Sequence, residues 1–108
     1  MKTGEVWLVE IPSSNGHEQS GLRPAIIFAD TNAGIAIIMP LTSNMQALRF
    51  PSTIEVKPTK HNGLHNISIA LVFQIRAIDK RRLKSRIGEL EEDIIKEINV
   101  ILVCIKFL

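Results

Sequence analysis

The amino-acid sequence predicts a compact, mostly antiparallel β-barrel closed by a C-terminal helix, which belongs to the mainly β, α+β fold class. Short apolar runs separated by turn residues fill the chain up to about Leu90, and a segment with helical periodicity follows. The chain has 108 residues, which is enough for one hydrophobic core and too few for a second. We therefore expect a single domain that spans residues 1–108.

Six apolar runs are expected to form the strands: Val6–Val9, Ala25–Phe28, Ile35–Met39, Ile54–Lys57, Ile67–Phe73 and Arg86–Leu90. The turn between the second and third runs is expected at Asn32–Gly34, because these residues tolerate positive φ. The fourth run alternates apolar and polar side chains, as a half-buried strand does. Asn62–Gly63 is a strong turn signal, and the long apolar run after it predicts a central strand.

The last segment has the period of a helix. Ile94, Ile98, Ile101 and Ile105 are spaced by four, three and four residues, which places them on one helical face, and Ile95 and Leu102 widen that face. Glu91, Glu92 and Asp93 stand at the start, where negative charge suits the helix dipole.

Composition limits the function classes. Hydrophobic residues make up 45% and charged residues 22% of the chain, as in ordinary globular domains. The net charge of +2 is too small for nucleic-acid binding by overall charge, so any such binding must use a local patch. The lone Cys104 cannot form an intramolecular disulfide, and its apolar neighbours predict a buried thiol.

With neither a signal peptide nor an apolar stretch of about 20 residues, we expect a cytoplasmic protein with no membrane contact.

A long polar loop is expected between Pro12 and Pro24. Long loops between strands are usually functional or disordered. Arg23 lies at the end of this loop, next to Pro24, where its guanidinium can present a bidentate fork to phosphate oxygens. The alternative is a structural salt bridge, for which Glu18 is the nearest candidate in the loop.

Four segments resemble the successive motifs of the MazF/PemK/Kid toxin family: Gly4–Trp7, Gly16–Pro24, Pro40–Ser43 and Gln74–Leu83. They occur in the family's order and extend over nearly the whole chain. The resemblance implies an SH3-like small antiparallel β-barrel of the CcdB/MazF kind that forms a homodimer. It also implies a toxin that cleaves single-stranded RNA in a sequence-specific reaction without ribosome, metal or cofactor.

The reaction that the resemblance implies is attack of a ribose 2′-hydroxyl on phosphorus, which leaves 2′,3′-cyclic phosphate and 5′-hydroxyl ends. Arg23 matches the family's loop arginine and is assigned to charge stabilisation, and Thr42 matches its catalytic threonine. The alternative for Thr42 is a strand-end hydroxyl bonded to its own backbone. His17 is the third catalytic candidate, as an imidazole suited to proton transfer. Relatives resembling Kid add charged strand residues, where this chain has Leu71 and Phe73.

Substrate binding is assigned to polar side chains that can contact base edges or phosphates of an unpaired strand. They are Asn15, Glu18, Gln19, Ser20, Ser43, Arg49 and Gln74. Aromatic residues make up only 5% of the chain; Trp7 is expected in the core, and Phe50 either lines the groove or is buried. His61 and His65 carry no recognisable constellation, and no residue cluster has metal-ligand spacing.

The resemblance also implies partners. A MazE-like antitoxin with an acidic, disordered tail would fold across the RNA groove, and DNA would be contacted only indirectly, through that antitoxin. Part of the terminal helix is expected to join the homodimer contact. Two alternatives remain: a CcdB-like toxin that inhibits DNA gyrase, and a non-catalytic binding module on the same barrel.

Overall fold

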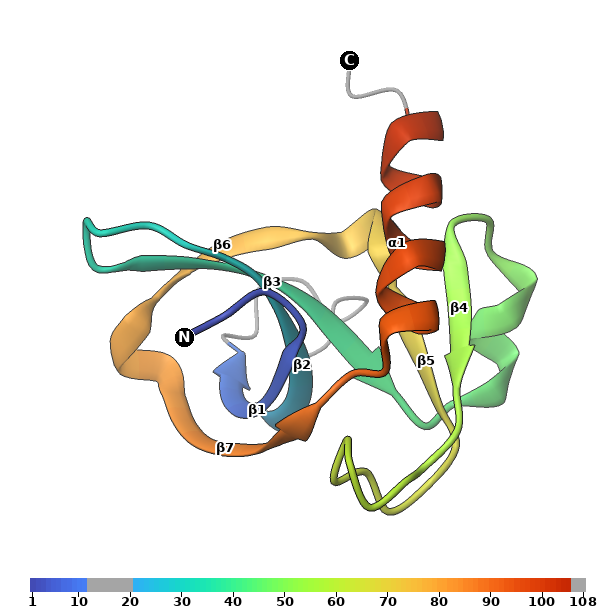
Figure 1. The fold of residues 1–108 in the computed structure, drawn as a ribbon, viewed down its shortest axis with the longest axis horizontal. Helices are drawn as coiled ribbons and strands as arrows, with labels where there is room; N and C mark the ends of the chain where they lie inside the picture. Colours follow the sequence, from blue (N-terminus) through green and yellow to red (C-terminus); the bar gives the residue numbers. More distant parts are fainter. Residues whose placement is uncertain (12–20, 106–108) are drawn as a thin grey trace.

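The computed structural model describes residues 1–11 and 21–105 (Figure 1). Its strands are β1 (Glu5–Ile11), β2 (Gly21–Asp30), β3 (Ile35–Thr42), β4 (Thr53–Val56), β5 (Ser68–Leu71), β6 (Arg76–Asp79) and β7 (Leu83–Glu89). Three short 3-10 helices lie between them, η1 (Met45–Arg49), η2 (Val72–Gln74) and η3 (Lys80–Arg82), and the helix α1 (Glu92–Cys104) follows β7. The described residues therefore have the predicted order of strands followed by one terminal helix.

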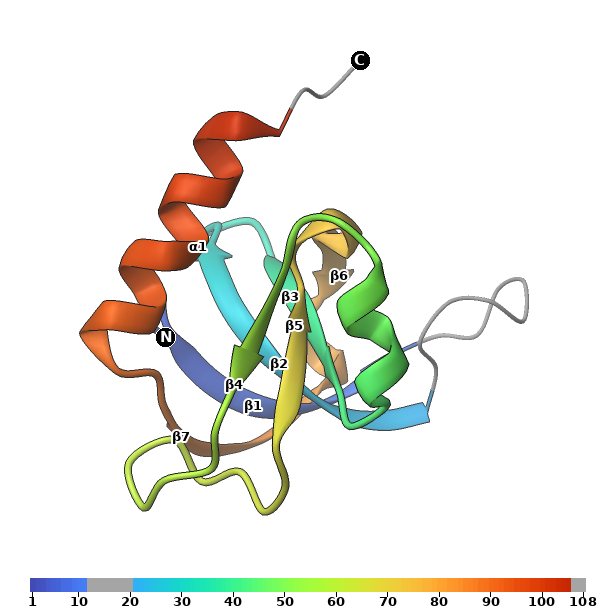
Figure 2. The same ribbon diagram turned by 90° about the vertical axis from the view of Figure 1, so that its right-hand side faces the viewer.

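All strand pairs are antiparallel, and β3 is shared between two halves of the sheet. The strand order is β4-β5-β3-β2-β1-β7, and β6 also pairs with β3. The first half of β3, Ile35–Ile38, pairs with β6, whereas Leu41 and Thr42 at its end pair with β5. The sheet curls strongly, and α1 and η1 flank the β4–β5 pair on opposite sides (Figure 2). The predicted mainly antiparallel β fold with a C-terminal helix is confirmed.

The hydrophobic core lies on both faces of the central strands. Ile26 and Met39 belong to a cluster that packs against α1, whereas their neighbours Ile27 and Ile38 belong to a second cluster on the other face. Strands buried on both faces read as continuous apolar runs instead of alternating ones. This explains why these runs were recognisable in the sequence without a period of two.

Helix α1 buries the predicted face. Ile98 is only 4% exposed, and Ile94, Ile95, Ile101, Leu102 and Ile105 pack partly buried against the same core cluster. The expected burial of Cys104 is wrong, because this residue is exposed. It lies in the last turn of the helix next to Val103, which is 86% exposed, so this side of the turn lies away from the barrel. No helix within the described ranges is long and apolar enough to cross a membrane.

Several strand boundaries differ from the prediction. Strand β2 begins at Gly21, so Arg23 lies within a strand and pairs with Val9 of β1, not at the end of a loop. The predicted strand Ile67–Phe73 is shorter: β5 ends at Leu71, and the chain continues as η2. It lies between β4 and β3, as a central strand should. Strand β6 was not predicted, since Ile78 is its only buried residue.

The predicted turn at Asn62–Gly63 is present, and it is packed under β7. Asn62 is fully buried, and Gly63 has a φ of 72°. A Cβ at Gly63 would lie 2.0 Å from the carbonyl oxygen of Ile87, and one at Gly88 would lie 2.3 Å from the carbonyl carbon of Asn62. The close approach of these two backbones therefore requires glycine on both sides.

Candidate functional site

Two of the cavities at the end of β3 are lined by Arg23 and by Thr42, respectively. The first, which we call the arginine cavity, has a volume of about 220 Å³ and is lined by Leu8, Arg23, Pro24, Leu41, Ser43, Gly63, Leu64, His65, Asn66, Ser68 and Ile87. The second, the threonine cavity, has a volume of about 210 Å³ and is lined by Thr42, Asn44, Gln46, Ala47, Arg49, Phe50, Leu71, Phe73 and Gln74. Five of the predicted site residues line one or the other: Arg23, Ser43, Thr42, Arg49 and Gln74.

The alternation of side chains along an extended chain accounts for the division at the end of β3. Leu41 and Ser43 line the arginine cavity, whereas Thr42 between them lines the threonine cavity. The structure therefore does not bring Arg23 and Thr42 into one cavity. Ala25 of β2 pairs with Pro40 of β3. Arg23 precedes Ala25 by two residues and Thr42 follows Pro40 by two residues, so the two cavities adjoin at this end of the sheet.

Thr42 is 5% exposed, and its hydroxyl oxygen accepts a hydrogen bond from the backbone N–H of Asn44 at 3.2 Å. This is the bond to the local backbone that was the structural alternative for Thr42. It uses a lone pair of the hydroxyl oxygen, so the hydroxyl proton takes no part in it. Asn44 in turn accepts a hydrogen bond from the backbone N–H of Gln46 at 3.0 Å and caps η1. These two bonds shape the turn that carries the wall of the threonine cavity.

Arg49 and Gln74 reach the threonine cavity from the ends of η1 and η2. Arg49 is exposed, and Gln74 is half-buried. Phe50 and Phe73 stand beside them, 51% and 42% exposed, with ring centroids 5.9 Å apart. Of the two alternatives for Phe50, the exposed groove position is the one observed. Phe73 was missed because the sequence placed it inside a buried strand.

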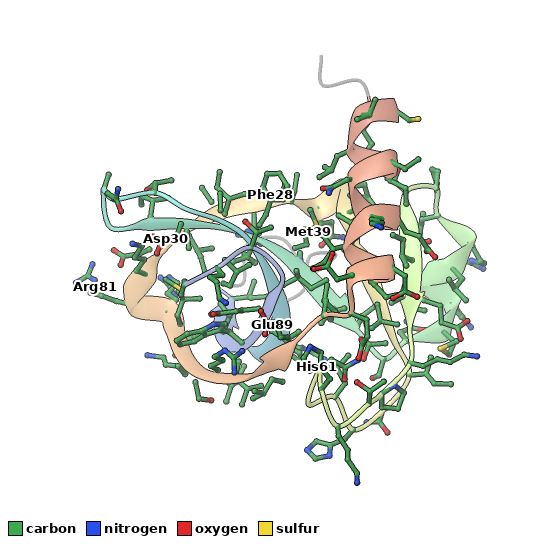
Figure 3. The ribbon with its side chains drawn as sticks, viewed as in Figure 1. Phe28, Asp30, Met39, His61, Arg81 and Glu89 are labelled. Atoms are coloured by element: carbon green, nitrogen blue, oxygen red, sulfur yellow. The ribbon has the colours of Figure 1, made fainter. Side chains whose placement is uncertain are left out.

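His65 was also missed. It is exposed and lines the arginine cavity with Arg23 and Ser43, although it is distant from both in the sequence. Its position depends on the packing of the Asn62–Gly63 turn against β7, which no local pattern shows. His61 is exposed in the same connection, near the start of α1 (Figure 3), and lines neither cavity.

Five predicted site residues, Asn15, His17, Glu18, Gln19 and Ser20, lie outside the described residues. Trp7 is half-buried, and its indole N–H donates a hydrogen bond to the carboxylate of Glu5 at 2.8 Å. Within residues 1–11 and 21–105, no group of three or more His, Cys, Asp or Glu side chains could hold a metal ion. Neither cavity lining includes an Asp or Glu among the described residues, which suits an anionic ligand.

The comparisons with known proteins identify the family. The family model of PemK-like, MazF-like toxins of type II toxin–antitoxin systems matches residues 2–104. An endoribonuclease MazF of Staphylococcus saprophyticus subsp. saprophyticus is 30% identical over 103 residues, which cover 92% of this chain and 85% of that relative.

Solved structures give the same result. The crystal structure of MazF (form I) from Deinococcus radiodurans has a TM-score of 0.75 at 25% identity, and the match covers 96% of this chain and 94% of that one. The MazE–MazF crystal structure (form II) from the same organism has a TM-score of 0.71 at 25% identity, with 96% and 93% covered. The chain belongs to the PemK-like, MazF-like toxins of type II toxin–antitoxin systems, a family of toxin endoribonucleases.

Proposed function

We propose that this chain is the toxin of a type II toxin–antitoxin pair and cleaves single-stranded RNA at specific sequences, without ribosome, metal or cofactor. The observation that carries the proposal is the gathering of Thr42, Arg49 and Gln74 around one cavity, adjoining the cavity lined by Arg23, in a chain of this family. An RNA strand that crosses the end of β3 would meet both cavities in succession.

The chemistry assigned to these residues follows from their side chains. The 2′-hydroxyl attacks the adjacent phosphorus, the 5′-oxygen of the next nucleotide leaves, and the products carry 2′,3′-cyclic phosphate and 5′-hydroxyl ends. Arg23 stabilises the negative charge that develops on the phosphoryl oxygens and can donate a hydrogen bond to the leaving oxygen. Thr42 donates its hydroxyl proton to the phosphate or orients the nucleophile. His17 is the candidate for proton transfer from the loop.

The partners follow from the family and from one neighbour. The structure from Deinococcus radiodurans contains MazF with MazE. We infer that this chain binds a MazE-like antitoxin whose acidic, disordered tail covers the RNA groove, and that DNA is reached only through that antitoxin. We also infer a cytoplasmic homodimer. The side of α1 that carries Val100 and Val103, 64% and 86% exposed, is available for such a contact.

The test is incubation of the purified, antitoxin-free protein with a long single-stranded RNA in EDTA, alongside the Arg23→Ala variant. We expect discrete cuts with cyclic-phosphate and 5′-hydroxyl ends, and a rate at least about 100-fold lower in the variant. Arg81→Ala is the matched control, because Arg81 is 90% exposed on η3, at the far end of the molecule from β4 and η1 (Figure 3). It should cut like the wild type.

Intact RNA across varied sequences, from a folded sample, would overturn the proposal. The same sample would then be assayed for inhibition of DNA gyrase, because a CcdB-like toxin requires DNA and gyrase and leaves RNA alone. Failure in both assays would favour a binding module without catalysis.

A further inference from the structure

Phe50 and Phe73 form an aromatic pair at the threonine cavity. Their ring centroids are 5.9 Å apart and their planes are tilted by 43°, within the range in which aromatic rings attract each other. Phe50 follows the last residue of η1, and Phe73 lies in η2, so the pair links two segments that are distant in the sequence.

The backbone holds the two ring-bearing segments together. The backbone N–H of Val72 donates to the carbonyl oxygen of Ser52 at 3.1 Å, and the neighbouring residues Thr53 and Leu71 pair across β4 and β5. Ser52 has a φ of 61°, which non-glycine residues adopt at a cost that the surrounding structure must offset. This turn places the two rings on the same side of the sheet edge.

Both side chains of the pair are exposed. Both rings keep about half of their surface in water, at 51% and 42%, whereas Ala47 and Leu71 of the same cavity are 8% and 2% exposed. Adjacent exposed apolar side chains next to a cavity mark contact sites for a ligand more often than scattered ones do. The pair therefore offers apolar ring surface beside a partly polar cavity.

The groups around the rings favour a nucleobase as the occupant. Asn44, Gln46 and Gln74 carry amides, which match the donor and acceptor pattern of base edges, and Arg49 can contact a phosphate. The cavity volume of about 210 Å³ is below the roughly 300–1,000 Å³ of pockets for drug-sized ligands, so it suits one planar base. A hydrophobic anchor of a protein partner would make no use of these amides.

We propose that the Phe50–Phe73 pair is a stacking platform for one unpaired base of the RNA substrate, with the amides of the threonine cavity contacting its edge. Stacking on aromatic side chains is a general way to hold single-stranded nucleic acid. The proposal rests on the proposed function and deepens it, because it assigns a base-binding position beside Thr42. Phe73 thereby becomes a substrate-binding residue in a position where the sequence indicated none.

The test uses single-stranded RNA heptamers of mixed sequence with 2′-O-methyl sugars, which cannot be cleaved by 2′-hydroxyl attack. 2-Aminopurine replaces the base at each position in turn, since its fluorescence falls when it stacks. We expect the wild type to quench strongly at one position. Phe50→Leu and Phe73→Leu should lose that quenching, and Phe50→Tyr and Phe73→Tyr should keep it. The double alanine variant should bind roughly 5- to 150-fold more weakly.

Leu48→Ala is the matched control, because Leu48 is 42% exposed on η1 and does not line the cavity. Leucine variants that bind and quench like the wild type would overturn the platform. So would a Leu48→Ala variant that loses as much binding, because the patch would then act as a general apolar surface for a protein. All of these side chains are exposed, and thermal melting checks that each variant folds.

Cleavage in EDTA separates the two proposals. If the wild type cuts RNA and the leucine variants cut it equally well, the platform is refuted and the endoribonuclease proposal stands. A wild type that does not cut but shows ring-dependent quenching refutes the endoribonuclease and leaves a base-binding site.

Discussion

The hydroxyl oxygen of Thr42 accepts a hydrogen bond from the backbone N–H of Asn44 at 3.2 Å, across the turn where β3 leads into η1. Thr42 also lines the threonine cavity. The Thr42 side chain thus holds the turn through Asn44 and is also the proposed contact for the substrate. Substitution can separate these two roles.

Thr42→Val keeps the shape of the side chain and removes the hydroxyl. We expect the single-turnover rate of RNA cleavage to fall about 100- to 1,000-fold, as when one preorganised donor to a developing charge is lost. The lost hydrogen bond should lower the free energy of unfolding by only about 0.5–1.5 kcal/mol. Thr42→Ser, which keeps the hydroxyl, should retain most of the activity. A Thr42→Val enzyme with more than a tenth of the wild-type rate would refute a role in the reaction.

His65 is expected to contribute to RNA binding through the arginine cavity that it shares with Arg23 and Ser43. Hydrogen bonds to charged groups contribute about 1.5–3 kcal/mol, so His65→Ala should lower kcat/KM at least about tenfold. His61→Ala is the matched control, as a second exposed histidine of the same connection that lines neither cavity. Equal effects of the two substitutions would argue against a specific contact at His65.

Asn62 should be the most sensitive position of the β4–β5 connection. Its amide oxygen accepts from the backbone N–H groups of Thr59 and Leu64, both at 3.0 Å, and its amide nitrogen donates to the carbonyl of Lys57 at 2.9 Å. Asn62→Ala leaves the buried N–H of Leu64 without this partner, at a cost of about 1–3 kcal/mol, and also removes the two part-buried bonds to Thr59 and Lys57. We expect a loss of roughly 2–4 kcal/mol in the free energy of unfolding, measured by urea denaturation.

Asn66→Ala is the stability control for that experiment, because the Asn66 side chain is exposed in the same connection. Its unfolding free energy should stay within about 0.5 kcal/mol of the wild type. An Asn62→Ala variant that is as stable as Asn66→Ala would mean that water replaces the lost bonds.

Glu5 predicts a pH dependence of stability. Burial alone would raise the pKa of this carboxyl, but the hydrogen bond from the Trp7 indole, a backbone hydrogen bond and the Arg86 guanidinium together hold the pKa below its ordinary value of 4.5. Because the pKa is lower in the folded state, the ionised carboxylate stabilises the fold at pH values above 4.5. That stabilisation is lost as the pH falls through the folded-state pKa.

Glu5→Gln removes the charge and keeps the shape. We expect the wild type to exceed this variant in unfolding free energy near neutral pH, and the difference to shrink on acidification below pH 4.5. Urea denaturation of both proteins over a series of pH values measures the difference. A difference that stays constant or grows in acid would contradict the role given to Glu5.

The strands and the helix could be predicted because their causes are local. Apolar runs such as those that became β2 and β3 are visible in any sequence, and the isoleucine spacing in α1 follows from 3.6 residues per turn. The boundaries were less certain, as Arg23 shows. Its strand position depends on pairing with Val9, and the partner strand is not visible locally.

The exposure of residues at the ends of elements could not be predicted from the sequence either. Phe73 continues an apolar run without interruption, yet the strand ends two residues earlier at Leu71 and the ring is exposed. Cys104 has apolar neighbours, yet the barrel does not reach the last turn of the helix. In both cases the apolar pattern continues beyond the surface that could cover it.

The sequence by itself determined the fold class, the family and the identity of Arg23, Thr42, Arg49 and Gln74 as candidates, because these depend on residue order and type. Only the tertiary structure decided how they group. Alternation at the end of β3 directs Ser43 and Thr42 into different cavities, and the pairing of β4 with β5 brings Phe50 beside Phe73. The packing of Gly63 against β7 sets the turn that carries His65. Such groupings depend on contacts between residues far apart in the chain, which no local pattern encodes.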